Sequence, residues 1–105
     1  MNKVGIDIVQ INRIKLNEEF LKKILHKDEL LLLDKKPTLE SKKQFVAGRW
    51  ACKEAIFKAV GKIEFSNINI TYNEQGQPII LGHDEILISI SHETDYAVAV
   101  AFAKK

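Results

Sequence analysis

Apolar residues at helical spacing predict one long helix in the middle of the chain. Ser41 followed three residues later by Gln44 is a capping-box pattern, and Gly61 stands where a left-handed C-cap places a glycine. The helix between them has about 19 residues and a length of roughly 28 Å. It carries two apolar stripes, namely Phe45, Cys52, Ala55, Ile56 and Ala59, and Val46, Trp50 and Phe57. Such a helix needs a packing partner on each of its two apolar sides. We expect the sheet of its own domain on one side, and the other side is available to another subunit.

Shorter apolar segments predict the elements around this helix. Val4 to Val9 is β-branched and predicts a buried strand, interrupted by Gly5 and Asp7. Helical spacing recurs from Phe20 to Leu25, and a second short helix is expected at 30–33, before Pro37. Four later strands are expected, at Ile68–Tyr72, Ile79–Leu81, Ile86–Ser91 and Tyr96–Ala103. One face of the last strand is all alanine, which lets a helix pack closely. The pattern therefore predicts an α+β fold with an antiparallel sheet packed against a long central helix.

Length and composition favour one globular domain. The 105 residues, 46% of them hydrophobic and 29% charged, fit a single domain spanning 1–105. The net charge of +2 is too small to indicate general nucleic-acid binding, so any preference for anions must be local. Cys52 is the single cysteine, and no stretch has the apolar length of a signal or membrane segment. We expect a cytoplasmic protein without a nucleic-acid or membrane partner.

Two carboxylates lie where their residue type needs an explanation. Asp7 is flanked by isoleucines in a predicted strand, where an unpaired buried charge would be very costly. It either caps a nearby backbone N–H or has a function. Glu54 lies within the long helix with Lys58 four residues later, and an exposed ion pair is the simpler interpretation. Cys52 is interpreted as a small core residue rather than a nucleophile.

Basic and nucleophilic residues offer weaker evidence. Lys42, Arg49 and Lys53 fall in a narrow arc of the long helix, which either accepts a polyphosphate or is a solvated charged face. Ser91 and His92 follow an apolar strand, but no G-x-S-x-G elbow precedes them, and they point apart if both are extended. His92 has either a turn-stabilising or a ligand-binding role. One cysteine, no histidine pair at ligand spacing and no Walker loop exclude a typical zinc site or nucleotide P-loop.

Three segments in order resemble the holo-acyl carrier protein synthases, a family of 4'-phosphopantetheinyl transferases. They are Gly5-Ile6-Asp7-Ile8-Val9 with Arg13, the stretch GRWACKEAIFKAVG, and the stretch ISISHETDYAVAVA. The similarity covers nearly the whole chain. It implies the 4'-phosphopantetheinyl transferase-like fold and transfer of the 4'-phosphopantetheine group from coenzyme A to a serine of apo-acyl carrier protein, in fatty acid or lipid biosynthesis. It also implies a homotrimer with active sites between subunits.

The resemblance implies a role for specific residues. Asp7 and Glu54 match the positions that coordinate Mg²⁺, which suits a hard cation that completes its shell with water and substrate phosphate. With Lys58 they form the implied catalytic set. The implied coenzyme A contacts are Arg49, Lys53, Lys58, Gly61, Ser91 and His92. Arg13 matches a carrier-docking position, and Lys22 and Lys23 are expected to compensate for Glu19, which stands just before Phe20, where family members often carry arginine.

The expected mechanism is in-line attack of the carrier serine on the β-phosphorus of coenzyme A, with adenosine 3',5'-bisphosphate as leaving group and most of the rate supplied by positioning and electrostatics. Two rival interpretations remain at this stage. One is a small α+β RNA-binding or protein-interaction domain without catalysis, although aromatic residues for base stacking are scarce in the strands. The other is a different Mg²⁺-dependent phosphotransferase.

Overall fold

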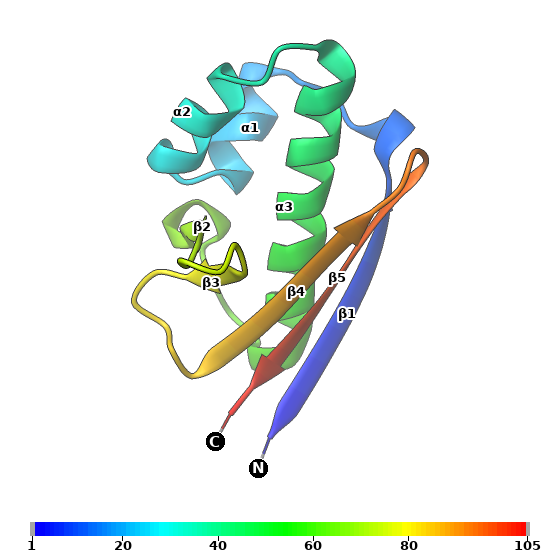
Figure 1. The fold of residues 1–105 in the computed structure, drawn as a ribbon. Coiled ribbons are helices and arrows are strands. Elements are labelled where there is room, and N and C mark those ends of the chain that lie inside the picture. The colour runs from blue at the N-terminus through cyan, green and yellow to red at the C-terminus, as the bar shows by residue number, and fades with distance from the viewer. Residues whose placement is uncertain (1, 105) are drawn as a thin grey trace.

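The computed structural model describes residues 2–104 of the predicted 1–105 domain, arranged around one central helix. This helix, α3 (Leu39–Val60), runs through the middle of the molecule, as Figure 1 shows. A sheet lies on one side of it, and α1 (Glu18–Ile24), α2 (Lys27–Asp34) and a small β-ribbon lie on the other. The predicted α+β fold with a sheet on a long helix is confirmed.

The strands form two separate sheets within residues 2–104 rather than one antiparallel set. The main sheet has the order β1 (Lys3–Gln10), β5 (Tyr96–Ala103), β4 (Ile86–His92), all antiparallel. The ribbon pairs β2 (Ile70–Tyr72) with β3 (Pro78–Ile80). The strand predicted from Ile68 begins two residues later, because the chain first forms a 3₁₀ turn at Phe65–Asn67. A similar turn at Ile11–Arg13 follows β1.

The ends of α3 differ from the prediction at both termini. Thr38 is the N-cap: its hydroxyl accepts from Ser41 N at 3.0 Å, and Ser41 Oγ accepts from Thr38 N at 3.1 Å. The helix therefore begins before the expected Ser41–Gln44 box and has 22 residues. At the other end, Gly61 N–H donates to Phe57 O at 2.8 Å. Its φ of 91° with ψ of −134° lies outside the left-handed helical region, but the positive φ still favours glycine.

Small residues bring α3 close to the main sheet. Ala97, Ala99 and Ala101 of β5 have at most 2% of their surface exposed and face the helix, as the alanine pattern predicted. The helix contributes small residues as well, namely alanines and Cys52, which is fully buried. Burial raises the pKa of the Cys52 thiol to about 12. The interpretation of Cys52 as a core residue is confirmed.

The second apolar stripe of α3 is covered by the chain itself only in part. Val46 is fully buried among residues of α1 and α2, and Trp50 packs edge-on against Phe20 with ring centroids 5.1 Å apart. Phe57, the third member of this stripe, is 46% exposed, so the expected contact of the stripe with another subunit stays a prediction. A further exposed apolar surface is the outer face of the main sheet. It comprises Val4, Ile6, Ile8, Leu87, Val100 and Phe102.

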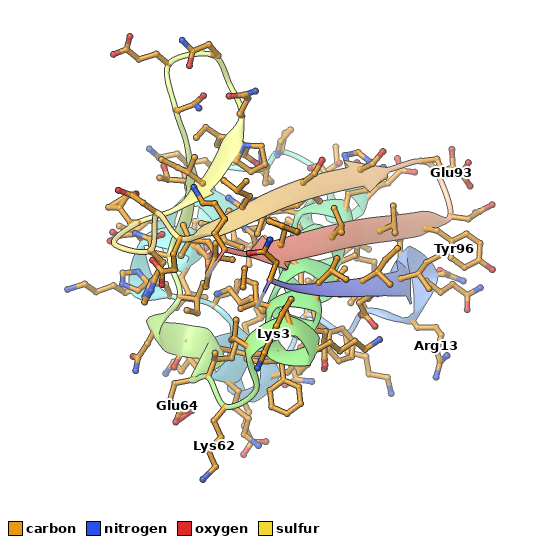
Figure 2. The ribbon with its side chains drawn as sticks, turned by 90° about the horizontal axis from the view of Figure 1, so that it is seen from below. Lys3, Arg13, Lys62, Glu64, Glu93 and Tyr96 are labelled. Carbon is orange, nitrogen blue, oxygen red and sulfur yellow. The ribbon has the colours of Figure 1, made fainter. Side chains whose placement is uncertain are left out.

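The two ends of the main sheet differ in what surrounds them. Figure 2 shows Arg13, Tyr96 and Glu93 at one end of the molecule and Lys62 and Glu64 at the other. The first end includes the β4–β5 hairpin, where Glu93 N donates to Tyr96 O at 2.9 Å.

Across residues 2–104, no helix combines the length and the apolar composition that crossing a membrane would require.

Candidate active site

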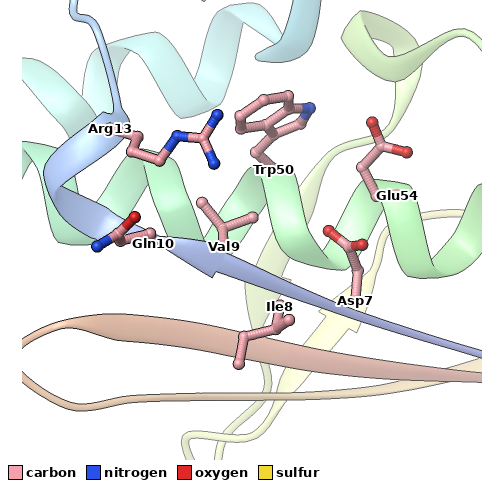
Figure 3. A pocket seen from close by; sticks show the side chains of 7 residues that line it. All are labelled: Asp7, Ile8, Val9, Gln10, Arg13, Trp50 and Glu54. Atoms are coloured by element: carbon pink, nitrogen blue, oxygen red, sulfur yellow. The ribbon is translucent and has the colours of Figure 1, made fainter.

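Asp7 and Glu54 line the same cavity between the edge strand β1 and helix α3. Alternation along β1 turns Gly5, Asp7 and Val9 toward α3 and the isoleucines between them outward. The cavity has a volume of about 400 Å³ and is lined by Asp7, Ile8, Val9, Gln10, Arg13, Trp50 and Glu54. Figure 3 shows the two carboxylates on the same side of this cavity, beside Trp50, with Arg13 beyond the indole.

Lys58 connects the helix to the strand through Asp7, which lines this cavity. Its Nζ donates to Asp7 Oδ1 at 3.1 Å and to the carbonyl of Ile6 at 3.0 Å. The Asp7 side chain is 20% exposed and that of Lys58 is 52% exposed. The simpler interpretation of the sequence paired Lys58 with Glu54 on the same helix. In the structure Lys58 pairs with Asp7 on β1 instead. The capping alternative for Asp7 is replaced as well, because the donor that it accepts from is an ammonium group.

The donor set fits a divalent cation that is shared with a substrate. Mg²⁺ is commonly bound through one or two carboxylates, with water and substrate phosphate oxygens as the other ligands. Two carboxylates from separate elements, open to the same cavity, meet that requirement. Among the residues described, no group of three or more His, Cys, Asp or Glu side chains is arranged to hold a metal by itself. A closed site of the structural zinc type is therefore not formed by residues 2–104.

Lys53 is not available to coenzyme A, which corrects the prediction made from the basic arc. Its side chain is fully buried, and its Nζ donates to the carbonyls of Ile24, Phe65 and Ile68 and to Glu29 Oε1, at 2.5 to 2.9 Å. Burial lowers the pKa of Lys53, and the Glu29 carboxylate opposes that shift. The ammonium group joins α1, α2 and the Phe65–Asn67 turn to α3.

The other two cations of the basic arc also face inward. Lys42 Nζ donates to the carbonyl of Leu33 at 3.1 Å, near the C-terminal end of α2. Arg49 is 3% exposed and donates to Glu29 Oε2 at 3.2 Å, to the carbonyl of Ile70 at 3.2 Å and to Tyr72 Oη at 3.1 Å. Helix C-terminal carbonyls and a buried carboxylate attract these cations, so the arc is neither a solvated face nor an open polyphosphate site.

Glu29 is the residue that sequence reasoning missed. It is fully buried, and its two carboxylate oxygens accept from Lys53, Arg49, His26 N and Ile70 N. The sequence does contain a local indication, because Glu29 stands three residues after the N-cap His26, the capping-box position. Its contacts with the long helix depend on the tertiary fold.

His92 and Ser91 end the edge strand β4 and point to opposite faces. His92 shares its face with Ile90, and both line a cavity of about 170 Å³ with Arg49, Tyr72 and residues of the first half of α3. Ser91, by alternation, lies on the outer apolar face of the sheet. The two predicted coenzyme A contacts are therefore not brought to one place within a subunit. Gly61 is exposed at the C-terminal end of α3.

Of the predicted carrier-docking residues, Arg13 lies at the Asp7–Glu54 cavity, and Lys22 and Lys23 lie on the surface of α1. Arg13 lines that cavity and also a smaller one of about 190 Å³ with Phe20 and Trp50. Lys22 and Lys23 are exposed on α1, and Lys22 pairs with Glu18 at 3.3 Å. Their role in docking stays a prediction.

The predicted site residues thus divide into two groups on opposite edges of the main sheet. Asp7, Glu54 and Lys58 lie at the β1 edge, while His92 and Arg49 line the cavity at the β4 edge, and β5 separates the two strands. The chain itself therefore does not bring the predicted site residues together in one place.

The comparison with known proteins agrees with this geometry. The family model of the 4'-phosphopantetheinyl transferase superfamily matches residues 3–101. A holo-[acyl-carrier-protein] synthase of Mycoplasma mycoides subsp. mycoides SC is 47% identical over 104 residues, which cover 96% of this chain and 93% of the relative. The corresponding protein of Staphylococcus carnosus is 37% identical, with 97% and 96% covered.

Solved structures of the same kind share the fold. The holo-(acyl-carrier-protein) synthase of Bacillus anthracis str. Ames, in complex with CoA (3',5'-ADP), superposes with a TM-score of 0.88 at 34% identity, covering 98% of this chain and 96% of that one. The enzyme of Neisseria meningitidis gives a TM-score of 0.85 at 30% identity, with 98% of both chains covered. The chain therefore belongs to the 4'-phosphopantetheinyl transferase superfamily, and its resemblance to the holo-acyl carrier protein synthases is confirmed.

Proposed function

We propose that this chain transfers the 4'-phosphopantetheine group of coenzyme A to a serine of apo-acyl carrier protein at the cavity between Asp7 and Glu54. The observation that carries the proposal is a cavity lined by two carboxylates, one of which accepts from Lys58, in a chain of this superfamily. The relative from Bacillus anthracis, which shares the fold, is in complex with CoA (3',5'-ADP). A non-catalytic RNA-binding or protein-interaction domain is not favoured.

Asp7 and Glu54 are the residues that would hold Mg²⁺. When bound there, Mg²⁺ neutralises and orients the phosphate oxygens of the substrate. Lys58 places its ammonium group beside Asp7, where two of its three donors bond to described residues and the third is available to a phosphate oxygen. Trp50 and Val9 form the apolar wall of the cavity, which limits water around the reacting groups.

The transfer forms one bond and breaks another at the same phosphorus. The serine oxygen of the carrier bonds to the β-phosphorus, and its proton passes to a water molecule held at the Asp7 or Glu54 carboxylate. The bond between that phosphorus and the bridging oxygen breaks, and adenosine 3',5'-bisphosphate leaves with the electron pair. No covalent enzyme intermediate is needed, so the chain contributes positioning and charge.

Replacement of either carboxylate tests the assignment. Loss of an outer-shell partner of a metal ligand costs roughly 10- to 100-fold, so loss of a ligand itself, by Asp7→Ala or Glu54→Ala, should lower transfer by about 10²-fold or more. Both residues are partly exposed, so the thermal midpoint should change little. Near-normal transfer by either variant would reject the metal assignment.

We further propose a homotrimer in which each active site has two half-sites, Asp7, Glu54 and Lys58 at the β1 edge of one subunit and His92 and Arg49 at the β4 edge of its neighbour. Two observations support it: the outer sheet face is apolar and exposed, and the half-sites lie at opposite edges of that sheet. An exposed apolar patch of this kind favours association. A cyclic arrangement brings the β1 edge of one subunit next to the β4 edge of another.

Mixed oligomers test the shared site. Glu54→Gln disables one half-site and His92→Ala the other, so each variant alone should be weakly active. When the two variants are co-expressed in equal amounts and mix at random, about a quarter of the interfaces combine a wild-type Glu54 with a wild-type His92. About a quarter of the wild-type activity should therefore return. Mixed oligomers without any recovery, or a monomer by light scattering, would contradict the shared site.

A further inference from the structure

Gly5 lies directly against the backbone of α3, two residues before Asp7. A Cβ atom at Gly5 would be 2.0 Å from the carbonyl oxygen of Ala55 and 2.9 Å from the amide nitrogen of Ala59. Both are backbone atoms, which cannot rotate away as a side chain can. By contrast, a Cβ at Gly48, elsewhere on the same helix, would meet a single side-chain atom, Ile90 Cγ2, at 3.3 Å.

The contact sits beside the residues of the proposed metal site on both elements. Gly5 and Asp7 project from the same face of β1 toward α3. On the helix, Glu54 immediately precedes Ala55, and Lys58 immediately precedes Ala59. The gap between the strand carrying Asp7 and the helix carrying Glu54 is therefore set at Gly5.

The strand cannot absorb an added methyl group by bending alone. β1 pairs with β5 along its whole length, from Lys3 opposite Ala103 to Gln10 opposite Tyr96. The sheet and helix must then move apart by about 1.5 Å to give a methyl carbon its normal clearance from the Ala55 carbonyl oxygen. That shift exceeds the roughly 0.2–0.5 Å by which the two coordination shells differ, because Mg²⁺ binds oxygen at about 2.1 Å and Ca²⁺ at about 2.3–2.6 Å. Ca²⁺ also tolerates a more flexible ligand geometry, so a wider gap disfavours Mg²⁺ more.

We propose that Gly5 is a positioning residue that sets the Asp7–Glu54 gap to the size of Mg²⁺ and so makes the site selective against larger cations. The inference rests on the proposed function, since it requires these two carboxylates to share the cation. Gly5 contacts neither metal nor substrate, and it acts through the distance between the two elements. A larger side chain at Gly5 weakens Mg²⁺ binding more than Ca²⁺ binding.

The test is calorimetric titration of the oligomeric enzyme with Mg²⁺ and, separately, with Ca²⁺, in the presence of coenzyme A and without carrier protein. Gly5→Ala should lower Mg²⁺ affinity by about 10-fold or more. It should lower Ca²⁺ affinity less, so the ratio of the two affinities falls. Ala59→Ser adds one atom to a buried residue whose backbone nitrogen forms this contact. It should change the ratio in the same direction by a smaller factor, and it serves if Gly5→Ala does not fold.

Ile80→Ala is the matched control for loss of stability. Ile80 is 2% exposed in β3, outside the β1–α3 contact, so its truncation should lower the thermal midpoint and leave the affinity ratio unchanged. Asp7→Asn separates this inference from the proposed function. If Asp7→Asn binds Mg²⁺ as tightly as the wild type does, the metal assignment itself is wrong. If Mg²⁺ binding does depend on Asp7 but folded Gly5→Ala or Ala59→Ser keeps the wild-type ratio, the spacer inference is overturned alone.

Discussion

Replacing Glu29 by glutamine should strongly destabilise the fold, although the two side chains have nearly the same shape. The two carboxylate oxygens of Glu29 accept from four groups, and all four are donors: Lys53 Nζ, Arg49 Nε, His26 N and Ile70 N. A glutamine has one acceptor oxygen and one amino group. The amino group would face two donors, and the buried cations would lose their counter-charge.

The expected size of the loss follows from burial. Lys53 and Glu29 are fully buried, and removing one partner of such a pair costs about 3–5 kcal/mol. A domain of this length has a free energy of unfolding of about 5–15 kcal/mol, so a large part of it would be lost. The corresponding fall in the thermal midpoint is about 12 °C or more.

Urea denaturation at neutral pH, with the slope checked for constancy, measures this loss directly. Glu18→Gln is the control, because Glu18 pairs with Lys22 at 3.3 Å on the surface and its replacement should cost under about 1 kcal/mol. A Glu29→Gln variant no less stable than the Glu18→Gln variant would refute the reasoning.

The Glu29→Gln defect should also depend on pH. Glu29 raises the pKa of Lys53 against the effect of burial, so without the carboxylate this pKa falls further below its unfolded value of 10.5. Between the two pKa values the unfolded chain binds more protons, and stability rises with pH. The defect should therefore shrink as the pH increases toward 10, although Arg49 keeps its charge.

Three further predictions concern other parts of the chain. The pKa of the Cys52 thiol is 9.0 in the unfolded chain and is raised to about 12 by burial in the fold, so above pH 9 the unfolded chain releases a proton that the folded one keeps, and stability falls. Urea denaturation should show a loss of about 1.4 kcal/mol in the free energy of unfolding between pH 8 and pH 10, which Cys52→Ala should lack. Gly61→Ala has open space for its methyl group but a φ of 91°, so thermal unfolding should show a cost of about 1–3 kcal/mol from backbone strain alone. Arg13→Glu should raise the KM for an acidic carrier protein with little change in kcat. A raised KM for coenzyme A instead would contradict the docking role of Arg13.

Local periodicity was sufficient for most of the fold. The alternation in Tyr96–Ala103 predicted both the strand and the alanine face that packs on α3, because strand faces repeat every two residues. The start of α3 was placed too late because the Thr38–Ser41 box has serine where glutamate or glutamine is typical.

Buried charge was the part that periodicity could not reveal. Lys53 is 24 residues from Glu29 in sequence, and a lysine on a charged arc is most often solvated. Only the packing of α2 against α3 shows that this ammonium group has no access to a ligand. The shared cavity of Asp7 and Glu54 likewise depends on how β1 lies on α3, and the family resemblance, not the spacing, indicated that the two belong together.

Mass spectrometry of apo-acyl carrier protein after incubation with this enzyme, coenzyme A and Mg²⁺ tests the central claim most directly. The carrier should gain about 340 Da, the mass of one phosphopantetheine group, on a single serine. The gain should be absent with the Asp7→Ala and Glu54→Ala variants. A carrier that stays unmodified by the folded wild-type protein, or that is modified equally well by both variants, would contradict transfer at the Asp7–Glu54 cavity.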